Sequence, residues 1–208
     1  EAQDLANILK AGKLPAPARI LEENVVGPSL GQEAIQSGLW SFVIAFILVL
    51  IYMVFFYSKA GIAADIALLV NIFFMFGVLA SFGTVLTLPG LAGIVLTLGM
   101  AVDSNVIIFE RVKEELRAGK GLRTAIADGY KAAYSAILDG NITTFLTAFV
   151  LFEFGTGPVQ GFATTLMIGI ATSLFTSIFI TRLVFEGWLK KDKNINFSNN
   201  ATRNFMKN

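Results

Sequence analysis

Long apolar runs, separated by short polar stretches, follow one another through most of this 208-residue chain. A helix that crosses the hydrocarbon core of a bilayer needs roughly 20 consecutive, mostly apolar residues. Five runs can supply that length, the fourth only if Asp139 and Asn141 lie at its margin or face protein. The pattern therefore predicts an all-α membrane protein with a five-helix transmembrane domain over residues 37–190. Its helices are expected at about 38–57, 64–86, 88–109, 132–154 and 158–185.

The two ends of the chain have a different composition from this domain. Residues 1–36 are polar, include a candidate strand at 19–26, and are too few for an independent domain, so we expect the end of a larger domain. Residues 191–208 are rich in asparagine and only weakly apolar, which is typical of a flexible linker. We expect that linker to lead toward a second half of the protein.

The loop between the third and fourth runs, residues 110–131, is predicted to be helical. Charged residues recur there at spacings of four, an apolar stripe accompanies them, and a turn over 118–121 divides the segment. These features indicate a helical hairpin at the membrane surface. It could be a solvated connector or a docking surface for another protein.

Positively charged residues mark one side of the membrane. Lysine and arginine occur at residue 59, throughout the loop 110–131 and after residue 181. The connections 87–90 and 153–160 contain neither residue type. Because cytoplasmic loops are enriched in these residues, the loop 110–131 and the C-terminus are predicted to be cytoplasmic. The N-terminal segment is then predicted to lie on the outer side.

Composition narrows the chemistry that this domain can perform. Hydrophobic residues make up 55% of the chain and charged residues only 15%, against about 25% charged in soluble domains. The chain has no cysteine and no histidine, so any side chain that carries protons near neutral pH must be a carboxylate. No nucleotide motif or metal-ligand constellation is present, and we expect no enzymatic activity, no cofactor, no bound metal and no nucleic-acid partner.

Asp103 is the strongest functional candidate, because it lies inside the third apolar run. Ionised side chains deep in a membrane are costly and usually carry protons, ions or substrate, although a static, hydrogen-bonded aspartate is the alternative. Its helix face also carries Ala92, Leu96 and Gly99, whose small members indicate packing on protein. No lysine or arginine lies deep in any of the five runs, so a cationic partner would come from another chain or half.

Four polar residues near the start of the fourth run are possible supports for Asp103: Asp139, Asn141, Thr143 and Thr144. For Asp139 and Asn141, capping of a helix N-terminus is an equally good interpretation. For the two threonines, ordinary helix packing is the simpler interpretation. Asp65, at the start of the second run, is interpreted as a capping residue.

Three motifs carry a resemblance to a known family. They are the segments 99–115 (GMAVDSNVIIFERVKEE), 139–144 (DGNITT) and 154–162 (FGTGPVQGF). In this order they resemble signatures of SecD, a family of accessory subunits of bacterial Sec protein export, with Ser104 where the family commonly has alanine. Segments 14–17 and 26–31 resemble the end of the family's first periplasmic domain.

This resemblance implies an RND-superfamily fold, of which the chain would supply five helices of a six-helix repeat. It also implies an inner-membrane protein that uses the proton motive force to pull a translocating polypeptide outward, with protons as the coupling ion and Asp103 as the essential intramembrane carboxylate. The implied partners are a SecF half or subunit that supplies the basic residue, a SecYEG-type channel, the polypeptide and membrane lipid. A passive translocon scaffold and another RND-type proton-coupled permease are the alternatives.

Overall fold

The structure is a computed structural model that describes residues 28–84, 86–190, 195 and 197. The chain divides into a unit of residues 1–33 and a unit of residues 34–208, and the second unit contains all five predicted transmembrane segments. The candidate strand at 19–26 lies outside the described residues. The helices are α2 (Pro28–Tyr57), α3 (Lys59–Ser81), α4 (Leu88–Arg117), α5 (Leu122–Phe154), α6 (Pro158–Phe175) and α7 (Thr181–Lys190), with a π-helical turn, η1 (Thr176–Ile180), between the last two.

Within the described residues, five stretches of helix are long and apolar enough to cross a membrane, which confirms the five predicted transmembrane segments. The fifth is formed by α6, η1 and α7 in continuous succession over residues 158–190. The starts of α4 and α6 agree with the predicted helix starts because proline marks both of them. Pro89 and Pro158 lie in the first turns of α4 and α6, where a missing N–H costs no hydrogen bond, and Thr87 accepts a hydrogen bond from the Gly90 amide at 3.1 Å.

Several helices extend beyond their apolar runs, which corrects the predicted bounds. α4 continues to Arg117 and α5 already begins at Leu122, so residues 110–131 are the ends of two long helices joined at 118–121. The predicted helicity and the turn agree with the structure, but the two arms of the predicted hairpin are continuous with α4 and α5 and do not form a separate element. The turn is held by Lys120, whose Nζ contacts Glu115 at 2.6 Å and Asp128 at 2.5 Å. These hydrogen bonds, that to Asp128 first, raise the Lys120 pKa.

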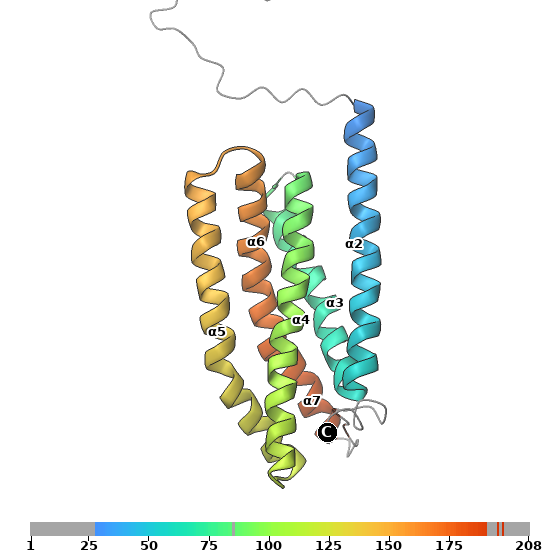
Figure 1. The fold of residues 1–208 in the computed structure, drawn as a ribbon, viewed down its shortest axis with the longest axis vertical. Helices are drawn as coiled ribbons and strands as arrows, with labels where there is room; N and C mark the ends of the chain where they lie inside the picture. The colour runs from blue at the N-terminus through green and yellow to red at the C-terminus, as the bar shows by residue number, and fades with distance from the viewer. Residues whose placement is uncertain (1–27, 85, 191–194, 196, 198–208) are drawn as a thin grey trace, which may run out of the picture. The chain divides into compact units, whose positions relative to one another are not determined.

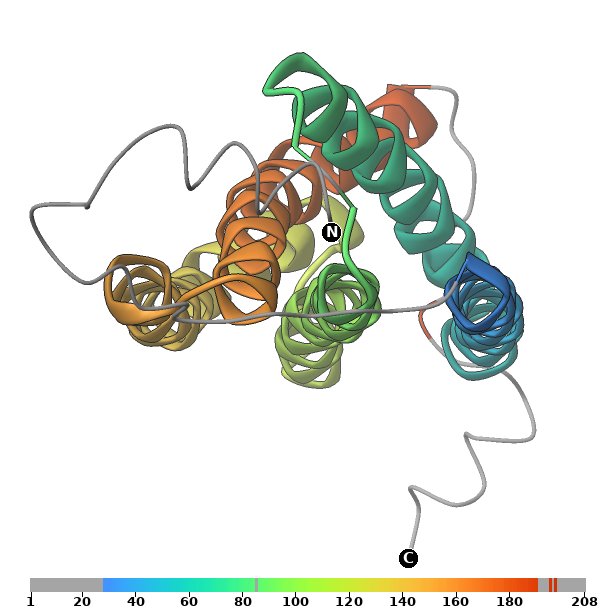
Figure 2. The same cartoon turned by 90° about the horizontal axis from the view of Figure 1, so that it is seen from above.

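α4 runs alongside both α6 and α5 (Figures 1 and 2). Close approach is made possible by glycine. A Cβ atom built on Gly169 of α6 would lie 2.7 Å from Thr97 Cβ on α4, and one on Gly129 of α5 would lie 2.8 Å from the Val112 amide nitrogen on α4. Lipid tails are as apolar as the helix surfaces, so the hydrophobic effect does not drive helices together inside a membrane. Tight packing of this kind is therefore a main source of stability there.

The helix connections separate into two sets, one at each end of the bundle (Figure 1). The α2–α3 junction at Ser58, the turn 118–121 and the end of α7 lie at one end. The connections between α3 and α4 and between α5 and α6 lie at the other. The connections rich in lysine and arginine thus share one end, as the topology prediction requires.

An aromatic cluster fills the lysine- and arginine-rich end. Phe109 of α4 lies 5.7 Å from Phe185 of α7 and 5.3 Å from Tyr57 of α2, measured between ring centroids. Phe197, which lies beyond α7, is only 4% exposed and packs 5.5 Å from Phe185, and Ile195 is buried with it. The chain after α7 therefore contributes to the core at these two positions, which a flexible, weakly apolar linker does not anticipate.

Candidate functional site

Asp103 lies halfway along α4, roughly 22 Å from the start of a helix that is about 45 Å long. Its side chain is exposed, and Ala92, Leu96 and Gly99 of the same face are exposed as well. A Cβ built on Gly99 would have no atom within 4 Å. The expected packing of this face on protein is thus not provided by the described part of this chain, and we call residues 92, 96, 99 and 103 the open face of α4.

A cavity of about 210 Å³ opens beside Asp103, between α4 and α5. Met100, Ser104 and Ile107 line it from α4, next to Asp103, and Asn141 and Thr144 are its polar residues from α5. Two of the four predicted supporting residues therefore lie at the same cavity as Asp103. Ser104 also lines it, with its hydroxyl donating to the Met100 carbonyl at 3.0 Å, whereas the sequence had marked this residue only as a departure from the alanine common in the resembled family.

Asn141 offers the cavity a hydrogen-bond acceptor. Its Nδ2 donates to the Ile137 carbonyl at 2.7 Å within α5, which fixes the orientation of the amide. Its Oδ1 is buried and has no hydrogen-bond partner among the described residues. A buried polar atom without a hydrogen-bond partner is energetically costly. This oxygen can therefore accept a hydrogen bond from a donor group that enters the cavity. A protonated carboxyl group or a water molecule can supply that donor.

The other two predicted supports, Asp139 and Thr143, do not line this cavity. Both are exposed on α5, where Thr143 donates to the Asp139 carbonyl at 2.8 Å and Ser135 donates to the Asp139 carboxylate at 3.4 Å. The capping interpretation of Asp139 and Asn141 is also wrong, because α5 begins at Leu122, more than four turns earlier.

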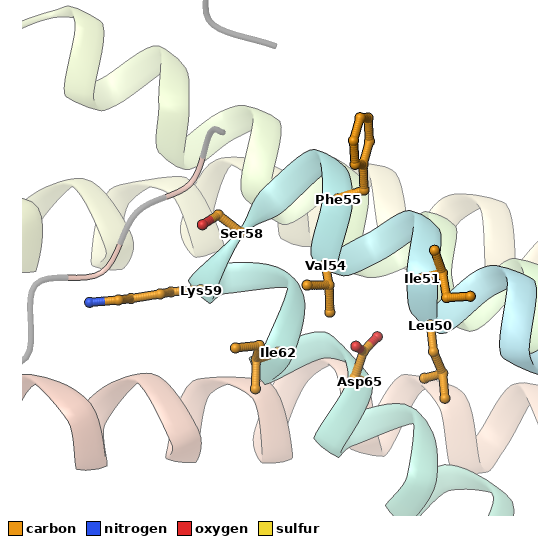
Figure 3. Close-up of a pocket in the computed structure, with 8 residues that line it drawn as sticks. All are labelled: Leu50, Ile51, Val54, Phe55, Ser58, Lys59, Ile62 and Asp65. Atoms are coloured by element: carbon orange, nitrogen blue, oxygen red, sulfur yellow. The ribbon is translucent and has the colours of Figure 1, made fainter. Parts of the chain in front are cut away.

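Asp65 lines a second cavity, of about 630 Å³, formed where α2 and α3 meet (Figure 3). The Asp65 carboxylate points toward Leu50 and Val54, whereas Lys59 extends away from it (Figure 3). Its Oδ1 is buried and has no hydrogen-bond partner among the described residues. Its capping interpretation is wrong, since α3 begins at Lys59 and Asp65 lies in its second turn.

A polar cluster two turns beyond Asp103 joins α4 to the end of α2. Glu110 accepts hydrogen bonds from the Tyr57 hydroxyl at 3.0 Å and from Lys113 Nζ at 2.8 Å. Lys113 also lies 4.3 Å above the centre of the Tyr57 ring, and its side chain is only 9% exposed. The Glu110 carboxylate is thus paired with the Lys113 ammonium group. In the described part of the chain, Asp103 forms no ion pair.

A buried polar contact connects α4 to the first residue of α7, directly after the π-helical turn η1. The Thr181 hydroxyl donates to Asn105 Oδ1 at 2.9 Å, and both residues are buried. The same hydroxyl contacts the Thr176 carbonyl at 3.4 Å, where the widened turn of the π-helix loosens the regular ladder of backbone hydrogen bonds. Asn105 thus positions α4 against α7 and faces away from the Asp103 cavity.

Together these features define a class of protein: an α-helical membrane protein whose described residues form five helices long and apolar enough to span a bilayer, with a carboxylate halfway along an open face of one of them. Among the described residues, no three carboxylates gather in a way that could hold a metal ion. In the part of the chain that the structure describes, Asp103 is the one ionisable residue that lines the small cavity between α4 and α5.

Comparisons with known proteins agree with this class. Residues 8–191 match the family model described as "Protein export membrane protein SecD/SecF, C-terminal". The chain is 58% identical to the protein translocase subunit SecD of Rhodothermus marinus over 89% of its own length and 30% of that protein's. It is 54% identical to SecD of Desulfurispirillum indicum, over 89% of this chain and 36% of that one.

A solved structure has the same fold. The crystal structure of SecDF, a translocon-associated membrane protein from Thermus thermophilus, matches 94% of this chain and 27% of its own with a TM-score of 0.83 and 41% identity. The chain belongs to the SecD/SecF family of protein-export membrane proteins. It spans about a third of the length of the curated relatives it matches.

Proposed function

We propose that this chain is the membrane part of a subunit that uses the proton motive force to assist export of unfolded polypeptides, and that Asp103 carries the coupling proton. The observation that carries the proposal is the placement of Asp103, exposed at mid-helix on the open face of α4, beside a polar cavity and without an ion pair among the described residues. The proposed partners are a SecF half or subunit, a SecYEG-type channel, the translocating polypeptide and membrane lipid.

The energetics suit a proton switch. An ionised aspartate at the centre of a membrane helix costs about 3 kcal/mol, whereas its neutral form costs less. A proton that crosses a potential of 100 mV releases about 2.3 kcal/mol, which is a similar amount. One proton can therefore drive Asp103 between a charged state, which needs a cationic or aqueous neighbour, and a neutral state, which does not.

Asn141 and Thr144 give the neutral state a place in the cavity. A protonated Asp103 becomes a hydrogen-bond donor, and the buried Asn141 Oδ1 is an acceptor at the same cavity. The Thr144 hydroxyl already donates to the Gly140 carbonyl at 2.9 Å, so its oxygen lone pairs are available to accept. The ionised form instead favours a cation presented to the open face of α4. Alternation between the neutral and the ionised form of Asp103 would move α4 relative to the SecF half or subunit. The proposed membrane orientation places the N-terminal segment in the periplasm and the C-terminus in the cytoplasm.

The test measures export in inverted inner-membrane vesicles that contain the full-length protein and the translocation channel, with ATP and with or without a proton gradient. Asp103→Asn is expected to abolish the stimulation by the gradient and to leave ATP-driven export without a gradient unchanged. Asp139→Asn is the matched control, because this carboxylate lies on α5 outside the cavity. Full gradient stimulation in the Asp103→Asn protein would refute the proposal, and an equal loss in both variants would do the same.

A passive scaffold predicts a different result. Several charges of the 110–131 region pair with one another, as in the contacts of Lys120 with Glu115 and Asp128 and of Arg111 with Glu114. Lys120 holds two of these contacts, so Lys120→Gln disturbs the charged surface of this region. If the protein acts as a scaffold that docks through this surface, the variant should reduce export both with and without the gradient. The proton-driven function predicts that this variant retains its response to the gradient.

A further inference from the structure

A third cavity, separate from those of Asp103 and Asp65, lies at the lysine- and arginine-rich end of the bundle. It has a volume of about 240 Å³ and is formed by the beginning of α5 and the length of α7. Its charged lining consists of Arg123, Arg182, Lys190 and Glu186, and its apolar lining includes Ile126 and Leu189. We propose that this cavity binds the phosphodiester headgroup of an anionic membrane lipid.

The charges of the lining are unbalanced in favour of an anion. Three cationic side chains stand against one carboxylate. Glu186 is engaged by Arg182, whose Nε donates to it at 3.1 Å, and this leaves the terminal nitrogens of that guanidinium available. Arg123 and Lys190 form no ion pair with any described residue. A planar guanidinium and an ammonium at one cavity are the side chains that bind phosphate oxygens best.

The position of Arg123 at the start of α5 also favours the binding of an anion. It lies in the first turn of α5, where the backbone N–H groups point outward and the helix dipole is positive. No side chain caps this helix start, and its first turn contains no acidic residue. A cation there is unfavourable by itself, and it is balanced when an anion binds between it and the cations of α7.

The apolar part of the lining favours a lipid over a soluble anion. Ile126 and Leu189 lie beside the charges, at the ends of helices that cross the membrane, which is where lipid headgroups meet acyl chains. The volume equals that of roughly eight water molecules, enough for a phosphate group with its glycerol carbons. A free phosphate ion would use the cations and gain nothing from the apolar residues, whereas a phospholipid uses both.

The experiment titrates the full-length protein, in micelles of an uncharged detergent, with phosphatidylglycerol, phosphatidylcholine or inorganic phosphate, and measures the bound fraction by native mass spectrometry. The double variant Arg123→Gln, Lys190→Gln removes two cavity charges. Lys131→Gln is the control, because Lys131 is an exposed cation of the same α5 helix that does not line the cavity. Glu186→Gln makes the opposite change, since it removes the carboxylate that lines the cavity among the described residues.

Phosphatidylglycerol is expected to bind more tightly than phosphatidylcholine. Each removed charge should weaken its binding about fivefold, so the double variant loses about 25-fold. The Lys131→Gln control should stay within about twofold of the native protein, and Glu186→Gln should bind several-fold more tightly. Three outcomes would overturn the proposal: equal affinity for the two lipids, an equal loss in the control, or displacement of the lipid by inorganic phosphate at equal concentration. None of them depends on the export activity proposed for Asp103.

Discussion

The contact between Gly129 of α5 and Val112 of α4 gives a sharp test of how the bundle is held together. In the Gly129→Ala variant, the new Cβ would lie 2.5 Å from Val112 Cγ2, 2.8 Å from its amide nitrogen and 2.9 Å from its Cα. Two of these atoms belong to the backbone of a helix, and they cannot rotate away. The two helices must therefore separate locally, in a region where Val112 is completely buried.

The magnitude follows from two opposing effects. Overpacking of a tightly packed interior costs about 1–3 kcal/mol, and contact with backbone atoms places this variant in the upper half of that range. Alanine is better than glycine inside a helix by about 1 kcal/mol, which offsets part of the cost. We expect the free energy of unfolding to fall by about 1–2 kcal/mol relative to the native protein.

Gly140→Ala is the matched control, because it makes the same change in the same helix where a Cβ has no atom within 4 Å. This control should gain about 0.5–1 kcal/mol from helix propensity. The free energy of unfolding of both variants is measured by titration of the protein in detergent micelles with a denaturing detergent, followed by circular dichroism. If Gly129→Ala proves as stable as Gly140→Ala, the close approach of α4 and α5 at Val112 is not as described.

Three further predictions concern the lysine- and arginine-rich end of the bundle. Lys113→Ala leaves a partly buried carboxylate without its cation and should lower the free energy of unfolding by about 1–3 kcal/mol, whereas Arg111→Ala breaks only an exposed pair and should cost less than about 1 kcal/mol in the same titration. Phe197→Ala should cost about 3 kcal/mol because the ring is 4% exposed, and Phe197→Leu should restore most of that loss. The pKa of Lys120, raised chiefly by its hydrogen bond to Asp128, should fall in Asp128→Asn when followed by NMR titration. Because the pKa in the folded protein lies above the unfolded value of about 10.4, this stabilisation is complete below that pH and is lost as the pH rises through the folded pKa.

The apolar pattern predicted the number of spans and the helix starts at Leu88 and Pro158, because both features depend on hydrophobicity and proline chemistry that are local in sequence. It misplaced the starts of α3 and α5. In α5 the backbone hydrogen bonding continues through the polar residues 123–131, and α3 begins at Lys59 because only Ser58 separates it from α2. The capping interpretations of Asp65 and Asp139 failed because of these earlier starts.

The candidate site was predicted in part. Asp103 stood out by its position in an apolar run, and the cavity joins it to Asn141 and Thr144. The sequence could not separate these two from Thr143, since that choice depends on the rotation of α5 against α4. Small residues on the open face of α4 indicate close packing, but they carry no information about which chain provides the partner.

The most direct test of the central proposal is a measurement of proton flux. The full-length protein and the translocation channel are reconstituted in liposomes that contain a pH-sensitive dye, and proton movement is followed while a polypeptide is being exported. Asp103→Asn should reduce the flux coupled to export to the leak of empty liposomes, whereas Asp139→Asn should leave it at the native level. A native proton flux in the Asp103→Asn protein would contradict the assignment of Asp103 as the proton carrier.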